Sequence, residues 1–313
     1  MSSSRPSHLA DPAGAVVAHV VCDLTAYLPF VTVASLQLLV AWYRGLCPPD
    51  RFVHYAIPET MDWDDIDDPL LTAQGRAAEA AGEALPFLAP VRTRVAAGRP
   101  FHILFWDGLD TDCYCFNLRC VRDDAKKDHA FVRVTMPASV DPGVLLGAAR
   151  ELADNIPYLS GHGGYAFAYD PDRKFDAFTA IYPVARRYWG IDVEDLNETL
   201  PLMGSAIKGA NWLTLLGAPF LETLAAETLR GVANANPRVQ IEGRKHGLLI
   251  RAGSAPTYGD RHRPDPDFHA LMAVGAALDP LIVRGHPTFS GDGFIDNDNT
   301  DGWFHRFYDP RGW

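Results

Sequence analysis

The chain has 313 residues, 48% of them hydrophobic, and its 28 basic and 39 acidic side chains give a net charge of −11. This length and composition allow a large buried core in one or two domains. The negative charge repels phosphate backbones, so it argues against a direct binder of DNA or RNA and favours a basic partner.

The N-terminal segment lacks the pattern of a signal peptide or a membrane span. Asp11 precedes the apolar run and Asp23 lies inside it, whereas a secretory signal has a basic start and an unbroken apolar stretch. The most apolar segment, 13–40, is interrupted by Asp23 and Pro29, and a spanning helix needs about 20 nearly continuous apolar residues. The five cysteines are odd in number and show no paired spacing, which favours a reducing compartment. We therefore expect a cytoplasmic protein without a membrane span.

The first half of the chain alternates patterns of strand and helix. Runs rich in β-branched or aromatic residues predict strands at 15–24, 51–57, 101–108 and 113–121. Helical patterns occur at 33–46, ending before Pro48, and at 70–97, with a break near Pro86. We expect 101–108 and 113–121 to pair with each other.

The second half contains two similar units of strand, capped helix and strand. The first unit has a strand at 131–137, Asp141-Pro142 opening a helix over 143–155, and a return strand at 163–170. The second has a strand at 246–253, Asp265-Pro266 opening a helix over 267–279, and a short strand at 281–283. These patterns predict an α+β fold, a single compact body with partly duplicated strand-helix-strand units around a mixed or antiparallel sheet.

No segment has the composition of a flexible linker between domains. We expect a flexible N-terminus over 1–12, one α+β domain over 13–285, and a C-terminal tail over 286–313. The tail is rich in Gly, Asp and aromatic residues. Its Phe and Trp side chains should pack onto the domain.

No motif carries a full catalytic set. The chain lacks the nucleophile elbow, the phosphate-binding loop, the zinc-protease motif and the dinucleotide fingerprint. Cys113, Cys115 and Cys120 can be drawn as three thiolate ligands, but buried unreactive thiols are the simpler interpretation. His262, Asp265 and His269 could assemble a metal site, although Asp265 is also placed to cap a helix. We expect no catalytic residue, no bound metal and no cofactor.

The strongest electrostatic feature is an acidic run with no basic residue between Arg51 and Arg76. Its six carboxylates and one tryptophan are Glu59, Asp62, Trp63, Asp64, Asp65, Asp67 and Asp68. One interpretation is a solvated loop. The other is a patch that meets the basic active-site cleft of a nucleic-acid enzyme and speeds association, with Trp63 as an apolar anchor.

Three segments of the second half carry a family resemblance: "RRYWGIDVEDLNETLP", "AIKGANWLTLLG" and "HGLLIRAGSAPTYGDRHRPD". Their order and wording resemble the TsiV-like family of type VI secretion immunity proteins, over about 16–283. The resemblance implies an antidote that binds a toxic effector, which for several members resembles a nuclease. We therefore expect an immunity protein that occludes the active site of a secreted toxin, and not an enzyme.

Residues of the family segments are expected to have structural roles. They are Lys208, Gly209, Asn211, Trp212, Gly253, Pro256, Gly259 and Asp260. Gly209 would allow a tight turn, Asn211 would hydrogen-bond the backbone, and Trp212 would fill the core. Two other functions stay open: a metal-dependent hydrolase that uses His262, Asp265 and His269, and an adaptor of the secretion apparatus.

Overall fold

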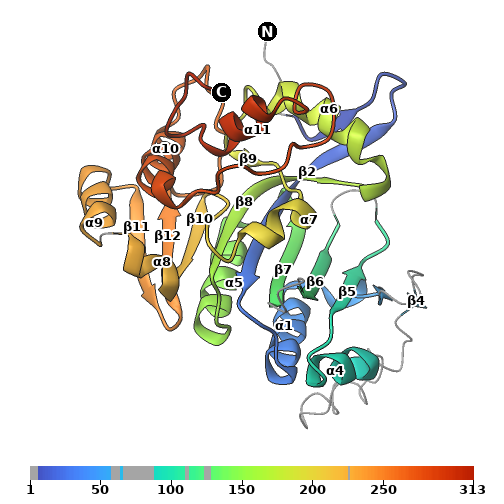
Figure 1. The fold of residues 1–313 in the computed structure, drawn as a ribbon. Helices are drawn as coiled ribbons and strands as arrows, with labels where there is room; N and C mark the ends of the chain where they lie inside the picture. The colour runs from blue at the N-terminus through green and yellow to red at the C-terminus, as the bar shows by residue number, and fades with distance from the viewer. Residues whose placement is uncertain (1–5, 58–63, 66–87, 110–112, 123–127, 225) are drawn as a thin grey trace.

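One continuous sheet of twelve strands runs through the protein (Figure 1). The computed structural model describes residues 6–57, 64–65, 88–109, 113–122, 128–224 and 226–313. The strands are β1 His8–Ala10, β2 Val16–Leu28, β3 His54–Ala56, β4 Asp64–Asp65, β5 Phe101–Trp106, β6 Cys115–Arg122, β7 Asp128–Pro137, β8 Ser160–Tyr169, β9 Ile191–Asp192, β10 Leu213–Gly217, β11 Val239–Arg244 and β12 Gly247–Ala252. Their order is β11-β12-β10-β8-β2-β7-β6-β5-β3-β4, with β1 beside β2 and β9 beside β8. The β8–β9 pair is parallel and the other pairs of the described strands are antiparallel.

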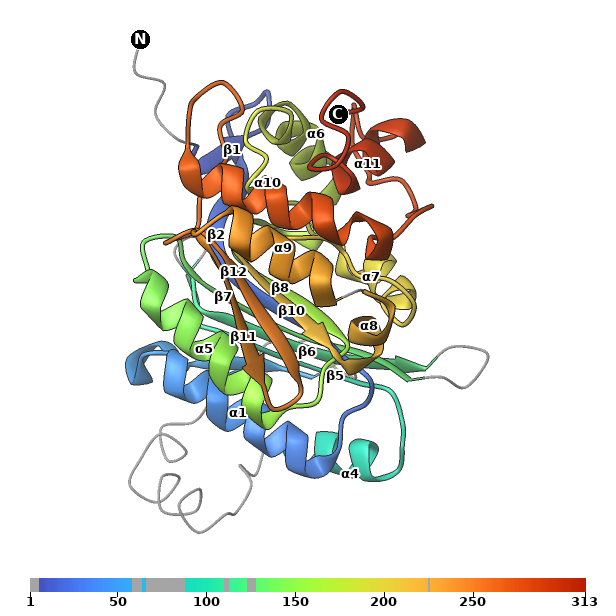
Figure 2. The same ribbon diagram turned by 90° about the vertical axis from the view of Figure 1, so that its left-hand side faces the viewer.

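Helices lie on both faces of this sheet (Figures 1 and 2). The α-helices are α1 Val33–Leu46, α4 Ala89–Ala96, α5 Pro142–Asn155, α6 Lys174–Ala185, α7 Leu196–Thr199, α8 Ala218–Thr223, α9 Ala226–Ala235, α10 Pro266–Leu278 and α11 Asn297–Phe304. Short 3-10 helices are η1 Pro49–Arg51, η3 Pro171–Arg173, η4 Leu200–Leu202 and η5 Asp279–Leu281. Helices α1, α4 and α5 share one apolar core, and α6, α10 and α11 share the other. Throughout the described residues, every helix is too short or too polar to span a lipid bilayer.

Local caps explain where the expected helices begin. The hydroxyl of Thr32 accepts a hydrogen bond from the Ser35 amide at 3.0 Å, and the Ser35 hydroxyl accepts one from the Thr32 amide at 2.7 Å. Asp141 caps α5 by accepting from the Gly143 amide at 2.7 Å. These contacts satisfy amide groups that have no partner inside the first helical turn. The expected bounds of α1 and the cap of α5 are confirmed.

The first strand-helix-strand unit is β7, α5 and β8, but the second unit lacks its return strand. After α10 the chain continues into η5, and Ile282 makes only an isolated bridge with Ile207. Pro280 favours this tight turn because it cannot donate a backbone hydrogen bond. The expected strand over 281–283 is therefore wrong, while the α+β architecture is confirmed.

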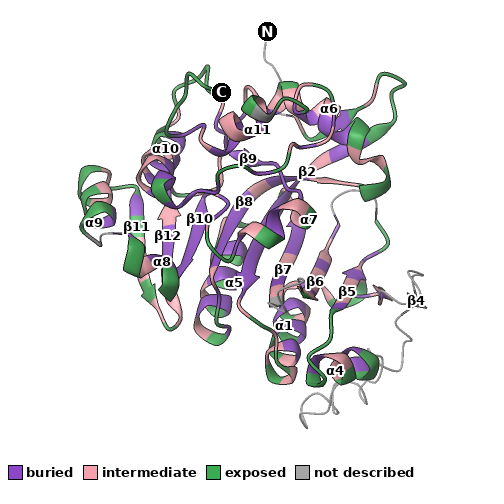
Figure 3. Cartoon of the chain, viewed as in Figure 1, coloured by how far each residue is buried: buried purple, intermediate pink, exposed green. Residues whose placement is uncertain are grey.

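The central strand β2 separates the two cores by alternation. Leu24 and Ala26 join the core under α1 and α5, and Asp23 and Thr25 point to the opposite face, since neighbouring residues of a strand project to opposite sides. All four side chains are buried, and the central strands of the sheet are coloured mostly as buried in Figure 3. The opposite face of the central sheet therefore buries polar groups, which need partners inside the protein.

The C-terminal segment contributes large aromatic side chains to the core shared by α6 and α10. Phe289, Phe294, Trp303 and Trp313 are each buried. The Phe294 ring stacks on Trp313 with centroids 5.9 Å apart, and both rings contact Tyr182 of α6. This segment is part of the folded body.

The acidic run falls largely outside the described residues. Glu59, Asp62, Trp63, Asp67 and Asp68 lie outside them, as does most of the helix expected over 70–97. The backbone of Asp64 and Asp65 forms β4, which pairs with His54 and Tyr55 at the edge of the sheet. Proposals about the run therefore rest on its sequence and on its attachment to this edge.

Candidate functional site

Two of the family segments meet in the core beside β10. Trp212 is 1% exposed, and its indole nitrogen donates to the Gly253 carbonyl at 3.3 Å. The Ala252 amide donates to the Trp212 carbonyl at 2.8 Å. Asn211 accepts from the Trp212 amide at 2.7 Å, as expected of a residue that bonds the local backbone. The two segments therefore hold each other in place.

Close backbone packing explains glycine at Gly259 and Gly253 but not at Gly209. Gly259 has a φ of +63°, and a Cβ there would lie 2.6 Å from the Gly190 nitrogen. Gly253 has a φ of +99°, and its Cβ would lie 2.7 Å from Cβ of Asp267. A Cβ on Gly209 would meet nothing within 4 Å. No close neighbour therefore accounts for glycine at Gly209, for which the sequence predicts a tight turn.

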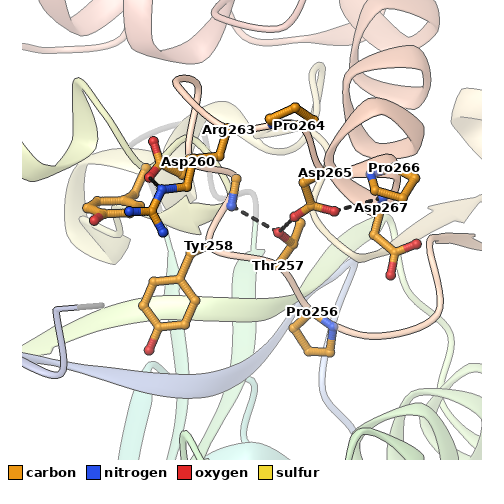
Figure 4. Close-up of a pocket in the computed structure, with 11 residues that line it drawn as sticks. Pro256, Thr257, Tyr258, Asp260, Arg263, Pro264, Asp265, Pro266 and Asp267 are labelled. Carbon is orange, nitrogen blue, oxygen red and sulfur yellow. Dashed lines mark hydrogen bonds and ion pairs between the residues drawn. The ribbon is translucent and has the colours of Figure 1, made fainter. Parts of the chain in front are cut away.

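The third family segment lines a surface pocket of about 360 Å³, together with Tyr188 (Figure 4). Its acidic side chains already have partners. Asp260 binds Arg187 at 2.8 Å, and Asp267 binds Arg238 at 2.8 Å. The Thr257 hydroxyl donates to Asp265, which also accepts from the Asp267 amide at 2.9 Å. The pocket is a network of satisfied polar groups beside the start of α10.

The residues of the alternative hydrolase site do not assemble. Asp265 caps α10, as its position before Pro266 predicts. His262 and His269 are exposed. In the part of the chain that the structure describes, the one group of potential metal ligands that comes together is His162, Asp192 and Glu194. The hydrolase alternative therefore has no support from the geometry.

Cys113, Cys115 and Cys120, the three possible thiolate ligands, do not all lie on the same face of the sheet. The Sγ atoms of Cys113 and Cys115 are 3.5 Å apart. Cys120 lies on the other face of β6, buried in the core under α1 and α5. The three cysteines therefore do not form a single site of three thiolates.

A buried ionic cluster lies behind the second family segment. Lys208 Nζ donates to Asp192 Oδ2 at 2.6 Å and to Glu194 Oε2 at 2.7 Å. His162 Nε2 lies 3.0 Å from each of the same two oxygens. All four side chains are buried. Two carboxylates therefore face one ammonium and one imidazole in a site away from water.

Strand register places this cluster on the polar face of the sheet. His162 of β8 pairs with Thr25 of β2, which pairs with Arg133 of β7. Arg133 forms a buried ion pair with Asp23, and Thr25 donates to Asp23 at 2.9 Å. The row of polar residues continues across three neighbouring strands.

The C-terminal segment closes over the cluster. Lys208 Nζ lies 5.6 Å from the centre of the Trp303 ring. Arg306 is buried, donates to the Trp189 carbonyl at 3.0 Å and stacks on Trp303 at 4.0 Å. The cluster is thus enclosed by groups from widely separated parts of the chain.

Charge balance explains why the cluster can be buried. Burial alone would lower the pKa of His162, but the charge of Asp192 and hydrogen bonds to Asp192 and Glu194 outweigh it and raise the pKa to about 9. Burial opposes ionisation of Asp192 and Glu194, yet Lys208 and His162 keep the pKa of both carboxyls below the ordinary value. Two positive and two negative groups then balance, which limits the penalty of burying them.

Comparison with known proteins agrees with the resemblance of the motifs. Residues 110–307 match the model of the family TsiV, described as type VI immunity for VRR-NUC. The chain belongs to the TsiV family. Of the 16–283 over which the motifs suggested the resemblance, the match covers 110–283, and it also includes most of the C-terminal segment.

The fold is similar to that of the Pseudomonas aeruginosa T6SS protein PA0821. The two chains are 18% identical, with a TM-score of 0.73, and the similarity covers 97% of this chain and 88% of that one. None of the curated proteins matches the chain in sequence. Membership of the TsiV family makes this protein a type VI immunity protein.

Metal analysis tests the role of Lys208 in this TsiV protein. We expect no stoichiometric zinc, manganese or iron in the purified protein, because the Lys208 ammonium already contacts both carboxylates that could bind a cation. Elemental analysis checks this. About one metal ion per chain, retained after dialysis against a chelator, would contradict it.

The raised pKa of His162 predicts a loss of stability at alkaline pH. A raised pKa stabilises the fold fully below the unfolded value of 6.5, and this contribution is lost as pH rises towards about 9. We expect the free energy of unfolding to fall more steeply across this range in the parent than in His162→Gln. Urea unfolding of both proteins at several pH values measures the difference. Parallel profiles would show that His162 does not carry the proton.

The sequence analysis did not identify the residues that surround Lys208 in the buried cluster. His162 lies in "SGHGGY", and Asp192 and Glu194 lie in "GIDVED". The available signal was Lys208 itself, a charged residue between apolar segments, since a buried lysine requires acidic partners. Nothing in the sequence indicated which acids these are.

Proposed function

We propose that this protein neutralises a cognate nuclease delivered by a type VI secretion system, by binding it and occluding its active site. The family description carries the proposal, because it names VRR-NUC as the target of this immunity family. The net charge of −11 supports it. A cleft that holds nucleic acid must be basic, and an acidic inhibitor is attracted to it.

The proposed compartment is the cytoplasm, because a nuclease toxin acts where nucleic acid is. A one-to-one complex or a small assembly would suffice for protection. Binding before the toxin meets DNA requires fast association, which opposite net charges promote.

The deciding experiment uses the toxin that the family resemblance implies is encoded beside this protein. We expect the purified nuclease domain to bind this protein, and DNA cleavage to stop at equimolar mixing. Excess catalytically blocked DNA substrate should slow complex formation, since occlusion makes the two ligands compete. A toxin that is bound but still cleaves DNA would contradict occlusion. Absence of binding would contradict the pairing.

The acidic run gives a kinetic prediction within this proposal. Changing Asp62, Asp64, Asp65, Asp67 and Asp68 together to Asn should slow association with the toxin and flatten its salt dependence, because opposite charges on two partners act mainly on the rate of encounter. The melting temperature of the variant, compared with that of the parent, shows whether the fold is kept. Stopped-flow kinetics at several ionic strengths measures both rate constants.

Three exposed acids outside the acidic run offer a control: Glu151 on α5, Glu222 on α8 and Glu227 on α9. Their change to Gln should slow association less than the five-residue variant does. An unchanged association rate and salt dependence in the five-residue variant would mean that the acidic run is a solvated loop.

A further inference from the structure

Helix α6 and the loop before α11 lie side by side in both views (Figures 1 and 2). The Asp292 amide donates to the Thr179 hydroxyl of α6 at 2.9 Å. Phe175 lies one helical turn before Thr179 on the same helix face, because residues four apart are neighbours on a helix. Phe175 is 54% exposed, and Ile295 of the loop is 63% exposed. Two large apolar side chains therefore face solvent on neighbouring elements.

The loop is held rigidly. Gly291 and Gly293 have φ values of +98° and +88°, and added Cβ atoms would lie 2.6 Å from the Thr179 nitrogen and 2.3 Å from the Tyr182 ring. On its other side, Asn299 of α11 donates to the Gly293 carbonyl at 2.7 Å. The exposed Ile295 is thus presented on a fixed backbone, and a preorganised contact loses little entropy on binding.

The residue directly before Ile295 is anchored among buried aromatic side chains. Phe294, directly before Ile295, is fully buried against Phe178, Phe289 and Trp313. The Thr300 hydroxyl donates to the Phe294 carbonyl at 3.0 Å. Exposure of Ile295 is therefore a property of the packed fold, because its immediate neighbour cannot leave the core without breaking these contacts.

Exposed acidic residues lie within three positions of the two apolar residues in the sequence. They are Asp172, Asp176, Asp292, Asp296 and Asp298. Two basic residues precede Phe175: Arg173 is paired with Asp11 at 2.5 Å and Asp176 at 3.3 Å, and Lys174 is paired with Asp195 at 2.5 Å. The α6–α11 face, defined as Phe175, Ile295 and these five acids, is thus apolar at two points and negative around them.

We propose that the α6–α11 face docks onto the basic, nucleic-acid-binding surface of the toxin, with Phe175 and Ile295 as apolar anchors. The inference rests on the proposed function and adds a contact surface to it. Complementary charge selects the occupant: the acids face lysine and arginine side chains that otherwise bind phosphate. The two apolar side chains are buried when the complex forms, as residues at the centre of an interface are. They slow dissociation because separation would expose them to water again.

The test compares two double variants in binding to the purified toxin nuclease domain. Phe175→Ser with Ile295→Ser removes the anchors. Leu38→Ser with Val144→Ser is the matched control, since Leu38 on α1 and Val144 on α5 are 49% and 40% exposed and belong to the helices of the opposite sheet face. We expect the first variant to weaken the Kd about tenfold or more, mainly through faster dissociation, and the control to change it less than about twofold.

Melting temperatures show whether each variant folds like the parent, and Ile295→Ser alone provides a milder change in the loop. Asp292→Asn with Asp298→Asn should slow association at low salt. Unchanged Kd in both anchor variants, or equal weakening in the control, would overturn the assigned surface. If the parent itself does not bind the toxin, the proposed function fails instead, so the two failures are distinct.

Discussion

Replacing Lys208 with methionine should lower the free energy of unfolding by about 3 to 5 kcal/mol, because removing one member of a buried ion pair leaves the other charges uncompensated. Lys208 contacts Asp192 and Glu194 at 2.6 and 2.7 Å, and its side chain is buried. The imidazole of His162 would then face two carboxylates, with the charge of the buried Arg306 also acting on Asp192. Urea or thermal unfolding measures the change.

A matched control and a double variant separate charge from packing. Lys245→Met removes an exposed lysine and should change stability by less than about 0.5 kcal/mol. Glu194→Gln added to Lys208→Met should recover part of the loss, because one carboxylate then balances one imidazole. A stability of Lys208→Met within about 1 kcal/mol of the parent would show that the cluster does not need the ammonium.

Trp212→Ala is expected to lower stability by about 3 to 5 kcal/mol, as large-to-small aromatic changes in cores do. The side chain is buried in the core shared by α1 and α5, and its hydrogen bond to the Gly253 carbonyl joins the two family segments. Its removal leaves a cavity and an unpaired carbonyl. Calorimetry and denaturant unfolding both measure this loss.

Trp212→Phe distinguishes the two contributions. It keeps an aromatic ring in the core but removes the indole N–H, so we expect a smaller loss than with alanine. Toxin binding by the remaining folded protein should be unchanged, since Trp212 does not reach the surface. An alanine variant that melts like the parent would contradict the structural role of the motif.

Local chemistry was sufficient to predict several elements of the fold. Helix α1 follows from an apolar pattern that ends before Pro48, and α5 and α10 follow from Asp-Pro pairs at their starts. These signals act within one or two helical turns, so they can be read from adjacent residues. The family segments likewise identified the family, although they did not show where its toxin binds.

Other elements were not predictable in this way. Helix α6 contains Pro183, which locally argues against a helix, and its buried face packs on aromatic residues of the C-terminal segment. The apolar run of β10 fits a strand or a buried helix equally well. Its pairing with β8 and β12 decides between them.

The α+β class, the helix caps and the family could be predicted from the sequence, because these depend on neighbouring residues or on short motifs. The binding of Lys208 to Asp192 and Glu194, and the approach of His162 from another strand, follow from the three-dimensional fold. Likewise, only packing against α6 shows that Ile295 is exposed while Phe294 is buried. The physical reason is that the partner of a buried charge, and the face that a side chain presents, depend on contacts between segments far apart in the chain.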